Sequence, residues 1–219
     1  MTDRPAGIIF DLDGTLLDTL ASLAKAFNMA LADLNCPPHP VDAYRRIIGD
    51  GARVAAMRAL PEKRQSSRDI ELCVGRFQRH YAENWQTATV YGGISELLSE
   101  LKPDYPLAVL SNKDESFTRQ CCDHFFPGLF TLAIGFSDRV IHKPDPSGAM
   151  RIAAHLDTDV RDLWVIGDTA TDMKTAVNTG MTGVGVLWGF RDRNELAISG
   201  ATHIIENPSE LTGLLGGIE

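Results

Sequence analysis

The stretch GIIFDLDGTLLDT, residues 7–19, carries the most informative pattern in this chain. Its apolar run leads directly into Asp11, and a single leucine separates that residue from Asp13. Two carboxylates this close repel each other, and apolar surroundings disfavour their charge further. A run of strand length that ends on such a pair therefore needs a counter-charge, which the rest of the sequence must account for.

Further apolar runs of strand length recur along the chain, and most are rich in β-branched residues. Because they are continuously apolar rather than alternating, they are typical of strands buried on both faces of a parallel sheet. Helical periodicity separates most of them, as in residues 94–101. This alternation predicts an α/β fold with a doubly wound, Rossmann-like parallel sheet. The runs are AGIIFDLD (6–13), PLAVLSN (106–112), TLAIGFSD (131–138), LWVIGDT (163–169), GVGVLWG (183–189) and THIIE (202–206).

About 90 residues between the first two runs contain no convincing strand. A stripe of apolar residues over 20–34 predicts a helix, with Asp18 or Thr19 as its N-cap, and more helical sequence follows over 42–60 and 68–85. We therefore expect an inserted α-helical cap at 18–84 and a catalytic α/β core at 1–17 and 85–219. The cap has a formal charge of +2 and the remainder −10. Such a split would favour an anionic substrate bridged by a cation, although ordinary scatter of surface charge explains it equally well.

Composition limits the classes of partner. The 219 residues carry a net charge of −8, which argues against general binding to nucleic acid or to an anionic membrane. No apolar run approaches the ~20 residues that span a bilayer, and the first residues lack the layout of a signal peptide. The four cysteines show no metal-ligand spacing, so we interpret them as reduced packing residues of a cytoplasmic protein. We expect the chain to be a monomer or a homodimer.

Polar side chains gather at the predicted carboxyl ends of the strands, where open α/β sheets bind their ligands. The four carboxylates among them cannot share a dry edge without a counter-charge. A hard divalent cation such as Mg²⁺ suits oxygen ligands and leaves positions for phosphate oxygens. The set is what phosphoryl transfer requires, and an aspartate can act as the covalent nucleophile. Its members are Asp11, Asp13, Thr15, Ser111, Asn112, Lys143, Asp168 and Asp172.

Each of the four segments that carry these residues has a simpler interpretation when it is taken alone. The Asp-x-Asp pair is often a metal-free loop or an N-cap, and Ser111-Asn112 is compatible with a turn. Lys143-Pro144 is compatible with an exposed loop. Asp168 and Asp172 are compatible with a solvated acidic helix start, which the helix dipole favours. The placement of all four pieces at successive strand ends is what favours a single site.

These residues resemble the four motifs of the haloacid dehalogenase superfamily of phosphatases. DLDGT matches the first motif, Ser111 the second, Lys143-Pro144 the third and GDTATD (167–172) the acidic fourth. Order and spacing agree along essentially the whole chain, and the insertion after the first motif resembles the helical cap of that superfamily.

The resemblance implies a role for each residue. Asp11 would form an aspartyl-phosphate, and Asp13 would protonate the leaving oxygen and then activate water. Ser111, Asn112 and Thr15 would bind the phosphoryl group, and Lys143 would offset its charge. The side chains of Asp11 and Asp168, with the Asp13 main-chain carbonyl, would hold Mg²⁺. Asp172 would support the metal shell or orient Lys143.

Within the superfamily the chain looks most like phosphoglycolate phosphatases, on stretches such as IIGDGAR, LSNK, KPDP and GVGVLWGF. We therefore expect a Mg²⁺-dependent phosphatase that acts on 2-phosphoglycolate or a similar phosphorylated organic acid. Arg53 is the candidate for a second anionic group of the substrate, whereas Arg45 and Arg46 fit solvated helix faces. Alternatives are a phosphosugar phosphatase or a phosphomutase of the same superfamily. More remote is a receiver-type phospho-acceptor signalling domain, whose motif order and length differ from these.

Overall fold

The computed structural model describes residues 4–216 and divides the chain into two compact units. The first contains the chain up to Leu17 and from Val90 on, and the second is Asp18–Thr89. Where the chain passes between them, the short strands β2 (Leu17–Asp18) and β3 (Thr89–Val90) pair with each other. Residues 1–3 and 217–219 of the predicted core lie outside the described residues.

The first unit is built on a six-stranded parallel sheet in the order β5-β4-β1-β6-β7-β8. Each of the six predicted runs forms one of these strands, which confirms the predicted fold class. The chain starts in the middle of the sheet and winds outward in both directions, as in doubly wound folds. The strands are β1 (Gly7–Phe10), β4 (Leu107–Asp114), β5 (Leu132–Phe136), β6 (Leu163–Gly167), β7 (Thr182–Val186) and β8 (His203–Ile205).

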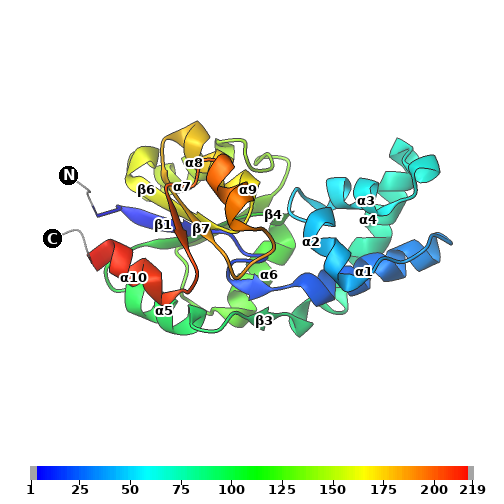
Figure 1. Cartoon of the computed structure of the whole chain (residues 1–219), viewed down its shortest axis with the longest axis horizontal. Coiled ribbons are helices and arrows are strands. Elements are labelled where there is room, and N and C mark those ends of the chain that lie inside the picture. The colour runs from blue at the N-terminus through cyan, green and yellow to red at the C-terminus, as the bar shows by residue number, and fades with distance from the viewer. Residues whose placement is uncertain (1–3, 217–219) are drawn as a thin grey trace. The chain divides into compact units, whose positions relative to one another are not determined.

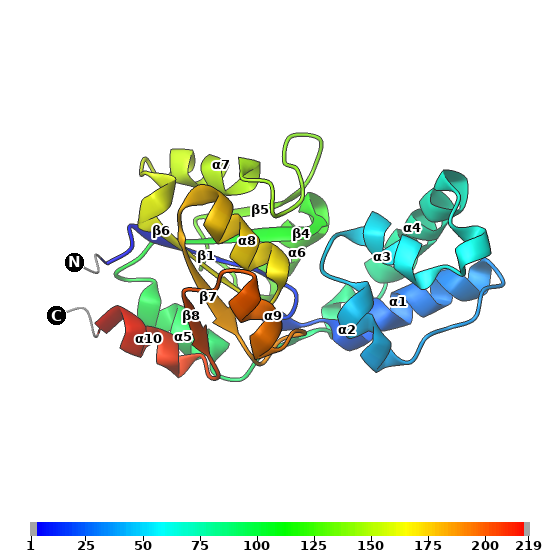
Figure 2. The same cartoon turned by 45° about the horizontal axis from the view of Figure 1, so that its top comes forward.

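Helices cover both faces of this sheet. In Figures 1 and 2, α7 and α8 lie on one face, and α5 and α10 lie on the other. The strands are therefore shielded on both sides, which explains why their sequences are apolar without alternation. The helices of this unit are α5 (Ile94–Leu101), α6 (Glu115–Phe125), α7 (Ser147–His155), α8 (Ala170–Thr179), α9 (Arg193–Ile198) and α10 (Ser209–Gly216).

The centre of the core is the β1 strand. Ile8, Ile9 and Phe10 have no exposed surface, and β1 pairs with β4 on one side and β6 on the other. Ile9 belongs to the apolar cluster that joins these strands to α7 and α8. A strand bonded on both edges and packed in this way gives the residue that follows it a fixed position.

The second unit is helical, with α1 (Leu20–Asp33), α2 (Tyr44–Ile47), α3 (Ala52–Ala59) and α4 (Ser67–Ala82). The rings of Phe27 on α1 and Phe77 on α4 stack with centroids 3.9 Å apart. At the start of α1, Asp18 accepts a hydrogen bond from the Leu20 N–H, whereas the Thr19 side chain makes no capping bond. Thr19 is thus the N-cap residue by position, but Asp18 supplies the side-chain acceptor.

The second boundary between the units lies five residues later than expected, at Thr89 rather than residue 84. The Asn84 side chain donates to the Ser22 carbonyl of α1, and the 3₁₀ turn Trp85–Thr87 follows with Trp85 buried. These contacts tie residues 84–87 to the helical unit. They are contacts between distant parts of the chain, which helical periodicity does not report.

All four cysteines are buried and free. Burial raises the pKa of the Cys73 thiol to about 11 and that of Cys122 to about 12. Thiols that resist ionisation are poor nucleophiles, so these residues act as packing residues. Among the described residues, no helix combines the length and the apolar character needed to cross a membrane.

Ile9→Ala should destabilise the first unit strongly. A buried isoleucine truncated to alanine loses about 2–5 kcal/mol, because the cavity that remains collapses only in part. Ile198→Ala is the matched control, since that side chain is 77% exposed and should change stability by less than about 0.5 kcal/mol. Urea unfolding followed by circular dichroism measures both, and equal effects would contradict the central position of Ile9.

Candidate active site

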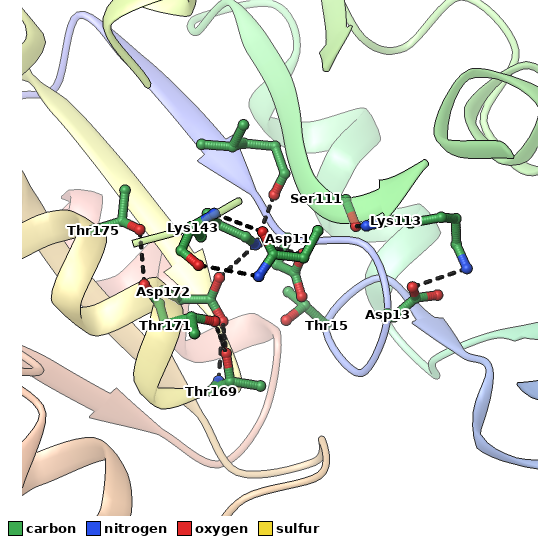
Figure 3. A network of polar contacts seen from close by, with 12 residues as sticks. Asp11, Asp13, Thr15, Ser111, Lys113, Lys143, Thr169, Thr171, Asp172 and Thr175 are labelled. Atoms are coloured by element: carbon green, nitrogen blue, oxygen red, sulfur yellow. Dashed lines mark hydrogen bonds and ion pairs between the residues drawn. The ribbon is translucent and has the colours of Figure 1, made fainter. Parts of the chain in front are cut away.

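Four of the predicted site residues converge at the carboxyl edge of the sheet, and Figure 3 shows three of them, Asp11, Lys143 and Asp172. Asp11 directly follows β1 and Asp168 directly follows β6, while Asp172 lies in the first turn of α8. Lys143 comes from the loop between β5 and α7. All four are at least nine-tenths buried, so the structure brings three carboxylates and one ammonium group into one enclosed cluster.

Lys143 is the hub of this cluster. Its Nζ lies 2.6 Å from Asp11 Oδ1, 2.6 Å from Asp172 Oδ1 and 2.8 Å from the Leu110 carbonyl oxygen. A lysine has three protons to donate, and these contacts use all of them. Burial alone would lower the pKa of Lys143, but the two carboxylates raise it above its ordinary value. The side chain is therefore a fixed positive charge beside Asp11.

Asp172 holds Lys143 from the opposite side. Its Oδ1 accepts from Lys143, and its Oδ2 accepts from both the N–H and the hydroxyl of Thr169, at 3.0 and 2.6 Å. A Cβ on Gly167 would lie 2.2 Å from Asp172 Cγ, so only glycine allows this close approach. Of the two roles expected for Asp172, these bonds favour the orientation of Lys143.

Asp168 is oriented by groups from two other loops. Its Oδ1 accepts from the Thr15 hydroxyl at 3.1 Å, and its Oδ2 accepts from the Phe190 N–H at 2.7 Å. The Thr15 side chain, which we expected at the substrate, is fully buried and donates to Asp168 instead. The Trp188 indole N–H donates to the Thr15 carbonyl at 2.9 Å, which ties the loop after β7 to the loop after β1.

The same carboxylates fit a divalent cation. One oxygen from each of Asp11, Asp168 and Asp172 lies within 4.8 Å of the others, and all three residues are buried. Lys143 contacts two of the three, so one ammonium group faces three carboxyl groups. Oxygen ligands in such excess are the donor set that Mg²⁺ prefers.

Burial and the excess of carboxyl groups raise the pKa values of two of the aspartates. Burial raises the pKa of Asp11 to about 7, against the opposing effect of Lys143. Burial, followed by the negative charges of Asp11 and Asp172, raises the pKa of Asp168 well above its ordinary value. Both groups resist ionisation in the absence of a cation, which a bound metal would relieve.

Ser111 and Asn112, at the end of β4, make different contacts. Ser111 Oγ accepts from the Lys113 N–H at 3.2 Å, which leaves its own O–H as a donor. The Asn112 side chain makes two hydrogen bonds to the main chain of Lys143. Its Oδ1 accepts from the Lys143 N–H at 2.6 Å, and its Nδ2 donates to the Lys143 carbonyl oxygen at 3.3 Å. Asn112 therefore braces the loop that carries Lys143, a role that the motif comparison did not suggest.

Asp13 points to a partner that sequence reasoning missed. Its Oδ2 lies 2.9 Å from Lys113 Nζ (Figure 3). Lys113 stands two residues after Ser111 on the same strand, so the argument from strand ends could have included it. The Phe190 N–H and the Trp188 indole were missed for another reason, because a main-chain donor and a ring in a loop carry no motif.

Arg53 lies on α3 of the second unit. Its side chain is 55% exposed, and its Nη1 lies 3.5 Å from Glu71 Oε1. Arg45 pairs with Asp42 within the same unit. Exposed pairs of this kind contribute little to stability, so the contact with Glu71 does not commit the Arg53 guanidinium to a structural role.

Residues 8–186 match the haloacid dehalogenase-like hydrolase family. The chain belongs to this family. Solved structures agree with the assignment. A haloacid dehalogenase-like family hydrolase of Streptococcus pneumoniae superposes with a TM-score of 0.88 at 25% identity, covering 96% of this chain and 98% of that one. A structure from Lactobacillus delbrueckii gives a TM-score of 0.91 at 28% identity, with 97% and 99% covered.

Curated relatives of this haloacid dehalogenase-like hydrolase carry a more specific name. Phosphoglycolate phosphatase 1 of Pseudomonas aeruginosa is 29% identical over 216 residues, which cover 96% of this chain and 79% of the relative. The phosphoglycolate phosphatase of Agrobacterium fabrum is 33% identical over 199 residues, with 88% and 85% covered. The present chain is thus an enzyme of the hydrolase family, which removes the receiver-type signalling domain from the alternatives.

The structure also corrects the simpler interpretations of the single motifs. Asp168 and Asp172 have no exposed surface, so they do not form a solvated acidic helix start. Lys143 is 5% exposed and bonded to two carboxylates, so it is not an exposed loop residue. Asp11 bonds Lys143 rather than capping a helix.

Mg²⁺ should stabilise this hydrolase more at pH 8 than at pH 5. The pKa of Asp11 is about 7 in the folded protein and near 3.8 in the unfolded chain. The contribution of Asp11 to the stability of the folded state is therefore full below about pH 4 and is lost as the pH rises through 7. A cation that pairs with the ionised carboxylates restores the lost stability. At a hundredfold excess over Kd the gain is about 2.7 kcal/mol, or roughly 5–10 °C in Tm.

Thermal unfolding with chelator and with Mg²⁺ at both pH values measures this difference. Asp168→Asn, which removes one charged ligand, should lose most of the Mg²⁺-dependent shift. Equal shifts at pH 5 and pH 8, or a full shift in the variant, would contradict a metal site in this cluster.

Proposed function

We propose that the chain is a Mg²⁺-dependent phosphatase that hydrolyses a small phosphomonoester through an aspartyl-phosphate on Asp11. The observation that carries the proposal is the buried Asp11 carboxylate, which ends the central strand and is bonded to Lys143 at 2.6 Å. A nucleophile needs a fixed position and neighbouring positive charge to approach an anionic phosphate. Family membership and relatives named phosphoglycolate phosphatase support the same chemistry.

In the first step a carboxylate oxygen of Asp11 attacks phosphorus, and the bond from phosphorus to the ester oxygen breaks. That oxygen takes a proton from Asp13 and leaves as an alcohol. Lys143 offsets the charge on Asp11 and on the phosphoryl oxygens, and the Ser111 hydroxyl donates to one of those oxygens. Asp172 and Asn112 keep Lys143 in place through the bonds described above.

In the second step a water oxygen attacks phosphorus of the aspartyl-phosphate and gives its proton to Asp13. The bond between phosphorus and Asp11 breaks, so inorganic phosphate leaves and both aspartates return to their starting states. A bound Mg²⁺, held by Asp11, Asp168 and the Asp13 main-chain oxygen, would supply the positive charge that neutralises the phosphate oxygens. Thr15 and the Phe190 N–H orient Asp168 for that task.

The proposed substrate class is a small phosphorylated organic acid such as 2-phosphoglycolate. The names of the curated relatives support this class. A phosphosugar phosphatase or a phosphomutase would use the same core residues. A panel of phosphate esters distinguishes them, since a mutase would rearrange a hexose phosphate without releasing phosphate.

Asp11→Asn should abolish turnover. The amide is not a nucleophile toward phosphorus, and loss of a catalytic nucleophile costs roughly 10⁴-fold or more in kcat. Phosphate release from 2-phosphoglycolate with Mg²⁺ measures this loss. Asp104→Asn is the control, because that exposed residue lies in the turn before β4 and should leave kcat unchanged. Substantial turnover by Asp11→Asn would exclude Asp11 as the nucleophile.

Arg53→Ala should lower kcat/KM for 2-phosphoglycolate by about tenfold or more, because a charge-assisted bond to the substrate carboxylate would be lost. Activity on nitrophenyl phosphate, which has no carboxylate, should stay the same. Arg45→Ala serves as the control from the same unit. An equal loss on both substrates, or none on either, would show that Arg53 does not select the substrate.

A further inference from the structure

The ion pair between Lys113 and Asp13 lies at the catalytic edge, and the mechanism above leaves it without a role. Lys113 Nζ lies 2.9 Å from Asp13 Oδ2, and the two side chains are 6% and 19% exposed. Figure 3 shows this pair extending away from the Lys143 cluster, with Lys113 reaching over from the end of β4. An exposed lysine pair contributes little, but this pair is largely shielded from solvent.

The main chain of Lys113 is held at several points. Its N–H donates to Ser111 Oγ at 3.2 Å, and its carbonyl accepts from the Thr118 hydroxyl at 3.2 Å. A Cβ on Gly135 of β5 would lie 2.6 Å from the Lys113 carbonyl oxygen, so the neighbouring strand packs directly against it. The main chain from which the Lys113 side chain extends toward Asp13 is therefore fixed in position.

The two oxygens of Asp13 have different surroundings. Oδ2 is bonded to Lys113, whereas Oδ1 is buried and has no hydrogen-bond partner among residues 4–216. A buried acceptor without a donor is costly, so such an atom in a native structure calls for an explanation, and a catalytic role is one of those known. Oδ1 is thus the carboxylate oxygen that lacks a donor within the described part of the chain, and a bound substrate or a reacting water would supply one.

We propose that Lys113 is a positioning residue that anchors Oδ2 of Asp13, so that Oδ1 is the oxygen that exchanges protons during both steps. This inference rests on the proposed function of Asp13 and extends it to a named oxygen and its support. Because the Lys113 N–H also bonds Ser111, one residue aligns the acid–base group and the phosphate-binding hydroxyl. Without the ammonium group, the Asp13 carboxylate would rotate and meet the leaving oxygen less often.

The test compares Lys113→Met, which keeps the length of the side chain and removes its charge, with Lys113→Arg. We expect Lys113→Met to lower kcat on 2-phosphoglycolate by about 10- to 100-fold, which is part of the ~10²–10⁴-fold that general acid–base catalysis supplies. KM should change by less than about threefold. Lys113→Arg should recover part of the loss, and Lys174→Met, on the exposed side of α8, should match the wild type.

A nitrophenyl ester separates positioning from simple loss of structure. Nitrophenolate leaves without a proton, so the first step needs little from Asp13, whereas hydrolysis of the aspartyl-phosphate still needs it. Rapid mixing of Lys113→Met with nitrophenyl phosphate should therefore give a burst of nitrophenolate that is larger than in the wild type. A variant that was merely misfolded would lower the burst and the steady rate together.

A double-mutant cycle with Asp13→Asn completes the test. If Lys113 acts through Asp13, the double variant should be no slower than Asp13→Asn alone, within about twofold. Losses that multiply, a raised KM with kcat unchanged, or no enlarged burst would overturn the proposal while leaving the phosphatase function intact. Wild-type kcat in Asp13→Asn would overturn both the proposed role of Asp13 and the role of Lys113.

Discussion

The contact between Lys143 and the two carboxylates of Asp11 and Asp172 is the constraint around which the rest of the catalytic edge is organised. Three segments far apart in the chain meet at one ammonium group, which donates to both carboxylates at 2.6 Å. A buried ion pair is weak evidence for stability, because desolvation offsets much of the attraction. Its value here is geometric, since each of the three side chains restricts where the other two can lie.

The surrounding residues make sense as supports for that contact. Asn112 fixes the main chain of Lys143, Thr169 fixes Asp172, and Gly167 leaves the space that Asp172 occupies. The Thr15 hydroxyl and the Phe190 N–H fix the Asp168 carboxylate in the same way, by donating hydrogen bonds to it. The central β1 strand, bonded on both edges, carries Asp11 at its end. Because these groups are held rigidly, the three carboxyl groups stay close together around one ammonium group, ready for a cation and an anionic substrate to bind.

The predictions made from sequence succeeded where a local pattern has one physical cause. All six strands of the parallel sheet were found because a strand buried on both faces must be apolar throughout, and the carboxyl edge was found because parallel strands end there together. They were less successful where the chemistry depends on the direction of a side chain. Thr15 and Asn112 were expected at the phosphate, but their side chains bond Asp168 and the Lys143 main chain. The boundary at Thr89 differed because the turn Trp85–Thr87 lies against α1, which is distant in sequence.

By itself, then, the sequence determined the α/β class, the order of the strands along the chain, the helical insertion after the first strand and the residue types gathered at the catalytic edge. Apolar runs, helical periodicity and the motif DLDGT are properties of short segments, so the sequence alone can report them. Only the tertiary structure decided that Asp13 faces Lys113 rather than Lys143, and that the Phe190 N–H bonds Asp168. Hydrogen bonds act over about 3 Å, so their partners are known only once distant segments have been brought together.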